Sequence, residues 1–444
     1  MLNFLKPAAD AATKVPDEKI SSKYKIWQLR VLTSSSIVYV GYYIIRLIFT
    51  TQQNDIRQAY GFSLSQIGLI LSTFGIGYGI AKLVMGTLAD RSNANRYVAT
   101  GLMVSSIINL FLGSTQNFYV IIVLMLLNSF MQGMGAAGCQ RLISLWFGRK
   151  ATGSIMARGT AYSIWSSAHN LGAFMCVATV NLSALFFGHS LQFSFYTASV
   201  VSFIIALFTW FVGSDRPASK GLPSIEQYSQ DELVKSDEAV TDLPVHEVFV
   251  KYILKNKLVW AVILTSLSIY IVRYGIMSWI PSYLTEFKGF KAADAKWLVG
   301  IFELSAVPGV IILGFISDLL KGRRAIVLII ALIGMVISLT TYFFATNHTL
   351  IVVMLLILGT LIYAPATIVG LMVNEAVPKF AVGMSTGSMG IAQYLIGEVV
   401  GTAVIGIAVD HYGWQAGNVV LYIAAAIAII CSLYIAKVQQ KTIK

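Results

Sequence analysis

Long runs of apolar residues alternate with short polar segments along the whole chain. A run of about 20 apolar residues can cross a lipid bilayer as a helix. The sequence predicts twelve such helices, at residues 31–52, 64–88, 97–114, 118–142, 159–187, 192–213, 258–284, 295–319, 324–345, 349–373, 382–409 and 415–437. We therefore expect an all-α membrane protein with twelve transmembrane helices.

The composition agrees with this pattern. Hydrophobic residues make up 57% of the 444 residues and charged residues only 12%, whereas about 25% are charged in a typical soluble protein. The predicted helices form two sets of six, an N-terminal half at residues 31–213 and a C-terminal half at residues 258–437. A charged segment at residues 214–257 is the predicted cytoplasmic linker, partly helical, and residues 1–30 and 438–444 are the predicted cytoplasmic tails.

Two short motifs occur once in each half at nearly the same offset. The tetrapeptide YIIR at residues 43–46 recurs as YIVR at residues 270–273, and GTLAD at residues 86–90 recurs as GFISD at residues 314–318. A shared offset indicates a duplicated chain whose halves have the same orientation. Parallel repeats of six helices, with a substrate site at mid-membrane between them, are a known plan of transporters.

The distribution of positive charge predicts the orientation in the membrane. The net charge is +12, and 25 of the 32 Lys and Arg residues fall in segments that are cytoplasmic if both termini are cytoplasmic. The predicted outer loops and their edges carry Arg57, Lys288, Lys291 and Lys296. Because cytoplasmic loops of membrane proteins are enriched in Lys and Arg, we interpret the charge as a topology signal facing anionic lipid and exclude a nucleic-acid partner.

The repeated motif places one arginine, Arg46 or Arg273, inside a helix of each half. An arginine in the hydrocarbon costs from about 2.5 to more than 10 kcal/mol by different measures, so it is rarely kept without a role. The planar guanidinium suits phosphate or carboxylate oxygens. If helices 1 and 7 are equivalent, the two arginines face each other across a central cavity and suit a dianionic phosphate. The alternative is that each arginine pairs with a glutamate for structure.

Four further titratable residues fall inside predicted helices. Lys82 either adds a positive charge to the substrate site or reaches toward the cytoplasm. His169 is either a substrate ligand or a hydrogen-bonded core residue. Glu303 and Glu398 are candidates for charge pairing with a cation in the empty state, or for carrying a proton.

The second repeated motif lies in equivalent predicted inner loops. Asp90 and Arg91 follow the predicted helix at residues 64–88, Asp318 lies at the end of the predicted helix at residues 295–319, and Arg323 follows it. An aspartate at a helix end beside basic loop residues can hold neighbouring helices in one conformation, so these four residues form a predicted conformational latch. Simple anchoring of the loops by positive charge is the alternative.

Other functional classes find no support in the sequence. The cysteines Cys139, Cys176 and Cys431 lie in apolar runs, which indicates packing residues rather than a disulfide framework or a metal site. No catalytic triad, metal-binding cluster or nucleotide loop is present. We therefore expect neither an enzyme nor a cofactor.

The hexapeptide at residues 86–91 resembles the inner-loop signature of the major facilitator superfamily, which implies the major facilitator fold. Within that superfamily the chain resembles the organophosphate:phosphate antiporters. The matching segments are residues 43–46, 78–82, 167–170, 252–257 and 272–275. The resemblance implies a phosphate site between Arg46 and Arg273, with Lys82 and His169 beside it. Tyr43 and Tyr274, which belong to matching segments, complete the predicted substrate-binding set.

Three stretches, at residues 14–19, 221–227 and 377–383, are most similar to members that carry phosphoglycerate. Hexose-phosphate carriers share residues 394–397 and the following acid, here Glu398, but place a lysine three residues later, where this chain has Gly401. The resemblance thus implies exchange of a three-carbon organic phosphate for inorganic phosphate.

Several alternatives remain at this stage. The substrate could instead be hexose 6-phosphate or glycerol 3-phosphate. The protein could be a transporter-like receptor for sugar phosphate, or a proton-coupled symporter that uses Glu303 or Glu398. We expect a monomer in the bacterial inner membrane with lipid as its surroundings.

Overall fold

We describe a computed structural model that covers residues 3–90, 92–148, 154–156, 158–229, 245–319, 324–377 and 381–443. These residues form helices and loops, and none of them forms a strand. Within this part of the chain, eleven helices are long and apolar enough to span a membrane. The predicted all-α membrane fold is therefore confirmed.

The long helices follow one another with short connections. The first set is α1 (Asp17–Thr51), α2 (Gln53–Tyr60), α3 (Leu64–Asp90), α4 (Ala94–Ser114), α5 (Phe118–Trp146), α6 (Arg158–Phe187) and α7 (Leu191–Val212). The second set is α10 (Lys257–Met277), α11 (Ile280–Ser282), α12 (Ala292–Leu304), α13 (Ala306–Leu319), α14 (Arg324–Phe344), α15 (His348–Glu375), α16 (Val382–Ile391), α17 (Ile405–Tyr412) and α18 (Trp414–Ile443).

Short helical pieces fill the remaining segments. They are the 3₁₀ turns η1 (Asn3–Leu5) and η2 (Pro217–Lys220), the helices α8 (Ile225–Ser229) and α9 (Val245–Val248), and the π-helical segments η4 (Phe249–Leu254), η5 (Tyr283–Phe287), η7 (Ala392–Glu398) and η8 (Val400–Val404). Asparagine side chains accept backbone N–H groups at the starts of α4, α5, α10 and α15. Such caps satisfy N–H groups that lack a partner in the first turn and so fix where these helices begin.

The first helix begins earlier than the hydrophobic pattern predicts. α1 starts at Asp17, directly after Pro16, so the second part of the predicted tail is helical. Tertiary contacts hold this polar extension in place. Tyr24 is fully buried, and the Gln28 side chain donates to the Trp146 carbonyl at 2.7 Å. Apolar periodicity could not reveal a helix whose buried residues are partly polar.

The eighth predicted span is divided in the structure. Residues 295–319 correspond to α12 and α13, which are separated at Ser305. Pro308 follows three residues later and lacks the N–H that would continue the helical hydrogen bonds. At the division itself, the Ser305 carbonyl accepts a hydrogen bond from the Thr360 hydroxyl on α15 at 2.9 Å. The two pieces together correspond to the eighth predicted crossing.

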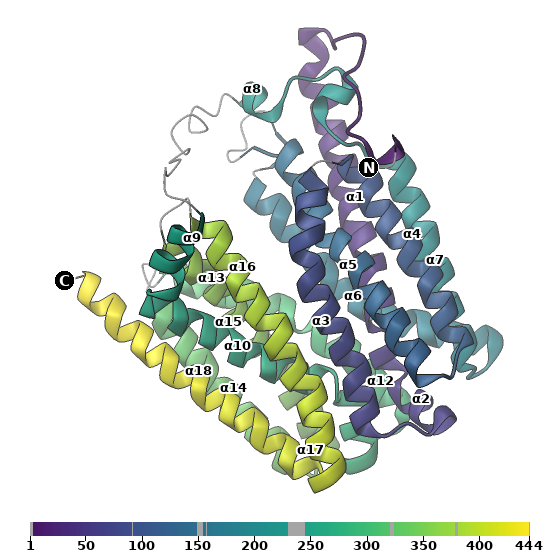
Figure 1. Ribbon diagram of the computed structural model, residues 1–444, viewed down its shortest axis with the longest axis vertical. Coiled ribbons are helices and arrows are strands. Elements are labelled where there is room, and N and C mark those ends of the chain that lie inside the picture. The colour runs from purple at the N-terminus through teal and green to yellow at the C-terminus, as the bar shows by residue number, and fades with distance from the viewer. Residues whose placement is uncertain are drawn as a thin grey trace. The chain divides into compact units, whose positions relative to one another are not determined.

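The described contacts divide the chain into two compact units. Unit 1 contains Met1–Phe49 and Ile80–Asp237, and unit 2 contains Thr50–Gly79 and Glu238–Lys444. In unit 1, α4 packs against α5 and α7, and in unit 2, α18 packs against α10 and α14 (Figure 1). Unit 2 thus includes the end of α1, all of α2 and the first part of α3. The two six-helix halves remain a prediction.

Candidate functional site

Three of the predicted substrate-binding residues lie together in unit 1. The Arg46 guanidinium on α1 lies 5.5 Å from the centre of the Tyr43 ring, one helical turn earlier. The Tyr43 ring lies 5.2 Å from the ring of His169 on α6. The His169 Nδ1 atom is hydrogen bonded to the Ser166 carbonyl. These side chains form a half-buried cluster of one arginine, one phenol and one imidazole.

A glycine brings the two helices of this cluster close together. A Cβ atom at Gly172 would lie 2.7 Å from the Tyr43 Cβ atom and 2.8 Å from the Val40 carbonyl oxygen. Glycine is therefore needed where α6 crosses α1, since small residues let helices approach closely in a membrane. This approach sets the distance between Tyr43 and His169.

The second repeated arginine lies in an aromatic environment in unit 2. The Arg273 guanidinium on α10 lies 4.2 Å from the ring centre of Tyr363, 5.4 Å from that of Tyr274 and 5.5 Å from that of Tyr270. Its side chain is 8% exposed, and its Nε atom is buried without a hydrogen-bond partner. Within the part of the chain that the structure describes, Arg273 makes no hydrogen bond or ion pair.

Glu303 is connected to this arginine through Tyr363. The Tyr363 hydroxyl on α15 donates a hydrogen bond to the Glu303 carboxylate on α12, which is fully buried. The same tyrosine presents its ring to Arg273. Tyr363 therefore lies between a buried acid and a buried base, and it holds the two opposite charges in one cluster. Sequence reasoning missed Tyr363 because a tyrosine in an apolar run carries no charge and matches no repeated motif.

The π-helical segments η7 and η8 pack against tyrosines that surround Arg273. Tyr394 in η7 contacts Tyr270 and Tyr274, with ring centres 5.6 and 6.5 Å apart. Glu398 ends η7 and is buried against α3, where a Cβ atom at Gly75 would lie 2.7 Å from its carboxyl carbon. π-helical turns inside α-helices frequently occur at functional sites.

Gly401 in η8 packs directly against α10. A Cβ atom there would lie 2.9 Å from the Gly275 nitrogen, the Ile271 carbonyl oxygen and the Tyr274 Cβ atom. The position three residues after Glu398 thus makes a close backbone contact. That contact lies two residues along α10 from Arg273.

The remaining predicted residues lie elsewhere or outside the described part. Lys82 is on α3 with an exposed side chain. Asp90 and Asp318 lie at the ends of α3 and α13, and the placement of their side chains is outside the described structure. Arg91 and Arg323 lie outside the described residues. The predicted inner-loop latch therefore remains a prediction.

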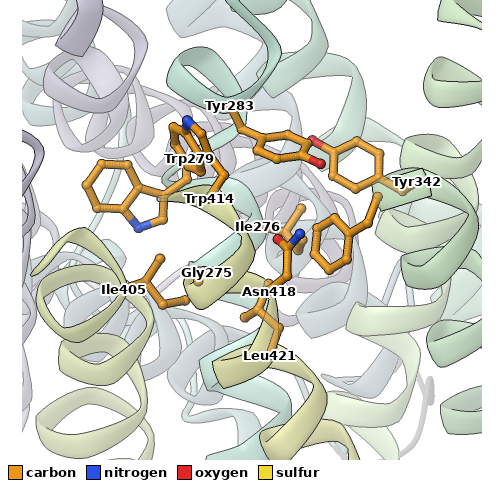
Figure 2. Close-up of a pocket in the computed structure, with 11 residues that line it drawn as sticks. Gly275, Ile276, Trp279, Tyr283, Tyr342, Ile405, Trp414, Asn418 and Leu421 are labelled. Atoms are coloured by element: carbon orange, nitrogen blue, oxygen red, sulfur yellow. The ribbon is translucent and has the colours of Figure 1, made fainter. Parts of the chain in front are cut away.

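A small cavity near Arg273 does not suit a substrate. Figure 2 shows that aromatic rings, among them Trp279, Tyr283, Tyr342 and Trp414, surround it, together with Asn418. Its volume is about 20 Å³, which is room for roughly one water molecule. An organic phosphate therefore cannot occupy it.

Comparison with known proteins identifies the family. The sequence profile of the Major Facilitator Superfamily matches residues 31–397 and 288–444. The chain is 34% identical to the glycerol-3-phosphate transporter of Bacillus subtilis, and the alignment covers 97% of each protein. This chain belongs to the organophosphate:phosphate antiporters of the Major Facilitator Superfamily.

Other family members cover the chain equally well. The phosphoglycerate transporter protein of Salmonella typhimurium is 32% identical over 98% of this chain and 93% of its own length. The hexose-6-phosphate:phosphate antiporter of Escherichia coli is 31% identical over 99% and 97%. These sequence identities are too similar to decide which relative's substrate this chain carries. The family relationship confirms a transporter class rather than an enzyme.

The fold also agrees with a solved transporter structure. A bacterial homolog of the human lysosomal transporter Spinster, in an inward-facing and occupied conformation, superposes with a TM-score of 0.72. The superposition covers 92% of this chain and 96% of the other, at 15% sequence identity. At this identity the similarity concerns the fold alone, and it confirms the predicted major facilitator architecture.

Proposed function

We propose that this family member exchanges an organic phosphate for inorganic phosphate, and that Arg46 and Arg273 bind the phosphate group. The observation that carries the proposal is the environment of Arg273. Its guanidinium is buried among tyrosine rings and, within the described residues, makes no hydrogen bond or ion pair. Arginine has five N–H donors and no acceptor, so a bound oxyanion would satisfy donors that the protein leaves unsatisfied.

The aromatic contacts are compatible with this role. A cation–π contact is an attraction to the face of the aromatic ring, whereas hydrogen bonds to phosphate use the guanidinium N–H groups. The tyrosines can therefore hold Arg273 in place without competing for the phosphate oxygens. Glu303 reaches the cluster through Tyr363 and supplies negative charge to the empty site.

We place the organic part of the substrate beside His169 and Lys82. A phosphoglycerate carries a carboxylate in addition to its phosphate, and that carboxylate needs a cation of its own. Lys82, and His169 when protonated, are the candidates. The close packing of Gly401 against α10 leaves no place for the additional lysine of hexose-phosphate carriers, which favours a three-carbon substrate with a carboxylate. Glycerol 3-phosphate is the second candidate, because a glycerol-3-phosphate transporter is 34% identical to this chain.

Counterflow of labelled phosphate in proteoliposomes tests the exchange. Vesicles loaded with inorganic phosphate should take up external labelled phosphate, and 3-phosphoglycerate should compete with it. Arg46→Lys and Arg273→Lys should each reduce uptake at least tenfold, because lysine keeps the charge but loses the bidentate fork. Arg30→Lys is the matched control, since Arg30 is an exposed residue of α1.

The same assay separates the alternatives. Near-native uptake by either variant would make that arginine structural. Saturable phosphate binding without any flux would indicate a receptor. Uphill uptake driven by a proton gradient into phosphate-free vesicles, lost in Glu303→Gln or Glu398→Gln, would indicate a symporter.

A further inference from the structure

Unit 2 combines residues 50–79 with residues 238–444, and side chains of the first segment contact the second. Residues 50–79 contain the end of α1, all of α2 and the start of α3. They contact the region that follows α10, including α11, η5 and the start of α12. By the charge bias this region lies on the outer side of the membrane. Its contacts have no assigned role in the proposed phosphate site.

Two ion pairs cross this contact. The Arg57 guanidinium on α2 pairs with the Glu286 carboxylate in η5, and the Lys296 ammonium on α12 lies 2.5 Å from the Asp55 carboxylate on α2. α2 thus presents one acid and one base, and its counterpart presents the opposite charges. The four side chains are partly exposed, so water can reach them when the contact separates.

Neutral polar groups continue the contact toward the interior. Asn54 donates to the Thr285 hydroxyl at 2.9 Å and accepts from the Ser282 hydroxyl at 2.7 Å. The Gln53 amide donates to the Ser278 carbonyl at 2.7 Å. Water can replace each of these partners, and the net worth of such a hydrogen bond is small because the exchange nearly balances. A contact of this composition can therefore open and close repeatedly.

A third connection lies at the start of α3. The Asp410 carboxylate on α17 accepts the backbone N–H groups of Leu64 and Ser65, at 3.1 and 2.6 Å. A carboxylate at a helix N-terminus satisfies free donors and interacts favourably with the helix dipole. α2 and α3 are thus held at separate points by η5, α12 and α17.

The contact is continuous with the helices that carry the proposed site. α1 bears Arg46 and runs to Thr51, one residue before Gln52 and α2. α10 bears Arg273 and runs to Met277, beside the Ser278 carbonyl that Gln53 contacts. A shift of either helix on phosphate binding would therefore act directly on this contact.

We propose that the ion pairs Asp55–Lys296 and Arg57–Glu286, with the Asn54 hydrogen bonds, form a latch that must open for substrate to pass on the side of α2. We call these contacts the α2 latch. The proposal rests on the proposed function only for the identity of the substrate. Opening of the latch can be measured without any transport. Four charged residues outside the proposed phosphate site thereby gain a role in the transport cycle: Asp55, Arg57, Glu286 and Lys296.

Alkylation of a buried cysteine measures opening. Ser278→Cys is introduced in a variant whose native cysteines are alanine, because the Ser278 side chain is 2% exposed and lies under the latch. Sealed vesicles are treated with a membrane-impermeant maleimide, and Ala292→Cys, at an exposed position of α12, reports in parallel which side the reagent reaches. The labelling rate of the Ser278→Cys thiol then reports how often the latch is open.

Removing one charge should increase this rate. Glu286→Gln and Asp55→Asn each delete one ion pair, so we expect about a fivefold increase for each and a larger one for both, from the upper range measured for partly exposed pairs. Asp294→Asn is the matched control. Asp294 is an exposed acid on the same helix as Lys296, and it makes no ion pair within the described residues.

Exchanging the two charges of one ion pair distinguishes opening of the latch from misfolding. Arg57→Glu alone should increase labelling, and Arg57→Glu combined with Glu286→Arg should return it toward the native rate. Native labelling rates in Glu286→Gln, Asp55→Asn and Arg57→Glu would overturn the latch, even if phosphate exchange is confirmed. A changed labelling rate without phosphate counterflow would instead support the latch and reject the proposed function.

Discussion

Replacing Tyr363 separates two effects that the structure combines in one side chain. Tyr363→Phe removes the hydroxyl that donates to the buried Glu303 but keeps the ring over Arg273. A hydrogen bond to a charged group contributes about 1.5 to 3 kcal/mol. We expect this variant to lose about that much stability while its Kd for phosphate changes less than about threefold, because the support of Arg273 is retained.

Tyr363→Leu removes the ring as well. A desolvated cation–π contact is worth about 2 kcal/mol, and 1.4 kcal/mol corresponds to a factor of about ten. The ring centre lies 4.2 Å from the Arg273 guanidinium, so loss of the ring removes a contact that holds the guanidinium in place. We therefore expect the Kd for phosphate to increase about 30-fold in this variant.

Calorimetric titration of the purified protein with phosphate gives the Kd, and thermal unfolding in the same detergent gives the stability. Tyr422→Phe is the matched control, because it deletes a hydroxyl bonded to Thr340 at 3.0 Å elsewhere in unit 2. The control should reduce stability by about 1 kcal/mol without affecting phosphate. A native Kd in Tyr363→Leu would refute the idea that the ring positions Arg273.

Three further predictions concern other parts of the molecule. Gly172→Ala should reduce phosphate counterflow severalfold, because its Cβ atom would lie 2.7 Å from the Tyr43 Cβ atom; Gly370→Ala, where a Cβ atom on α15 meets open space, is the comparison. In competition assays 3-phosphoglycerate should inhibit phosphate uptake more strongly than glucose 6-phosphate, and the reverse order would favour a hexose substrate. The Lys82→Ala substitution should reduce inhibition by 3-phosphoglycerate more than it reduces inhibition by glycerol 3-phosphate. Burial raises the pKa of the Glu286 carboxyl, while the nearby Arg57 opposes this rise. The carboxylate is lost as pH falls through that raised pKa. Acidification should therefore increase the labelling rate of the Ser278→Cys thiol relative to that of the Ala292→Cys thiol when Glu286 is present, and not in Glu286→Gln; the ratio corrects for the smaller thiolate fraction at low pH.

The sequence predicted those parts of the site that carry a formal charge in an apolar run. Arg46 and Arg273 stand out because a charge in hydrocarbon is costly and because the motif around them is repeated. The rings of Tyr363 and Tyr270 lie 4.2 and 5.5 Å from the Arg273 guanidinium, and Tyr394 packs against Tyr270, but an amphipathic tyrosine is common in membrane helices. Only the tertiary arrangement distinguishes these rings from packing residues.

The positions of the helices were predicted well, whereas their internal breaks were not. At the division, the Ser305 carbonyl accepts a hydrogen bond from Thr360, which is far away in the sequence. The start of α1 at Asp17 depends on the burial of Tyr24 and Gln28. The pairing of α2 with η5 joins two charges that lie 229 positions apart in the sequence. Hydropathy reports burial in lipid and contains no information about these pairings.

The α2 latch and the arginines have different proposed roles in the transport cycle, and one variant distinguishes these roles. A strict exchanger must return slowly when it is empty. The latch consists of polar contacts that water can replace at small net cost, so it is a poor barrier against an empty carrier. We propose that the barrier arises at the arginines, because the Arg273 Nε atom is buried without a hydrogen-bond partner in the protein.

Glu286→Gln should therefore open the latch more often and yet preserve strict exchange. Labelled phosphate loaded into vesicles should leave only when a phosphate compound is present outside, at a rate at least equal to that of the native protein. The Asp294→Asn variant should behave as the native protein in both conditions. If Glu286→Gln released phosphate into a phosphate-free medium, the latch itself would be the barrier that enforces exchange, and the assignment of that barrier to the arginines would be wrong.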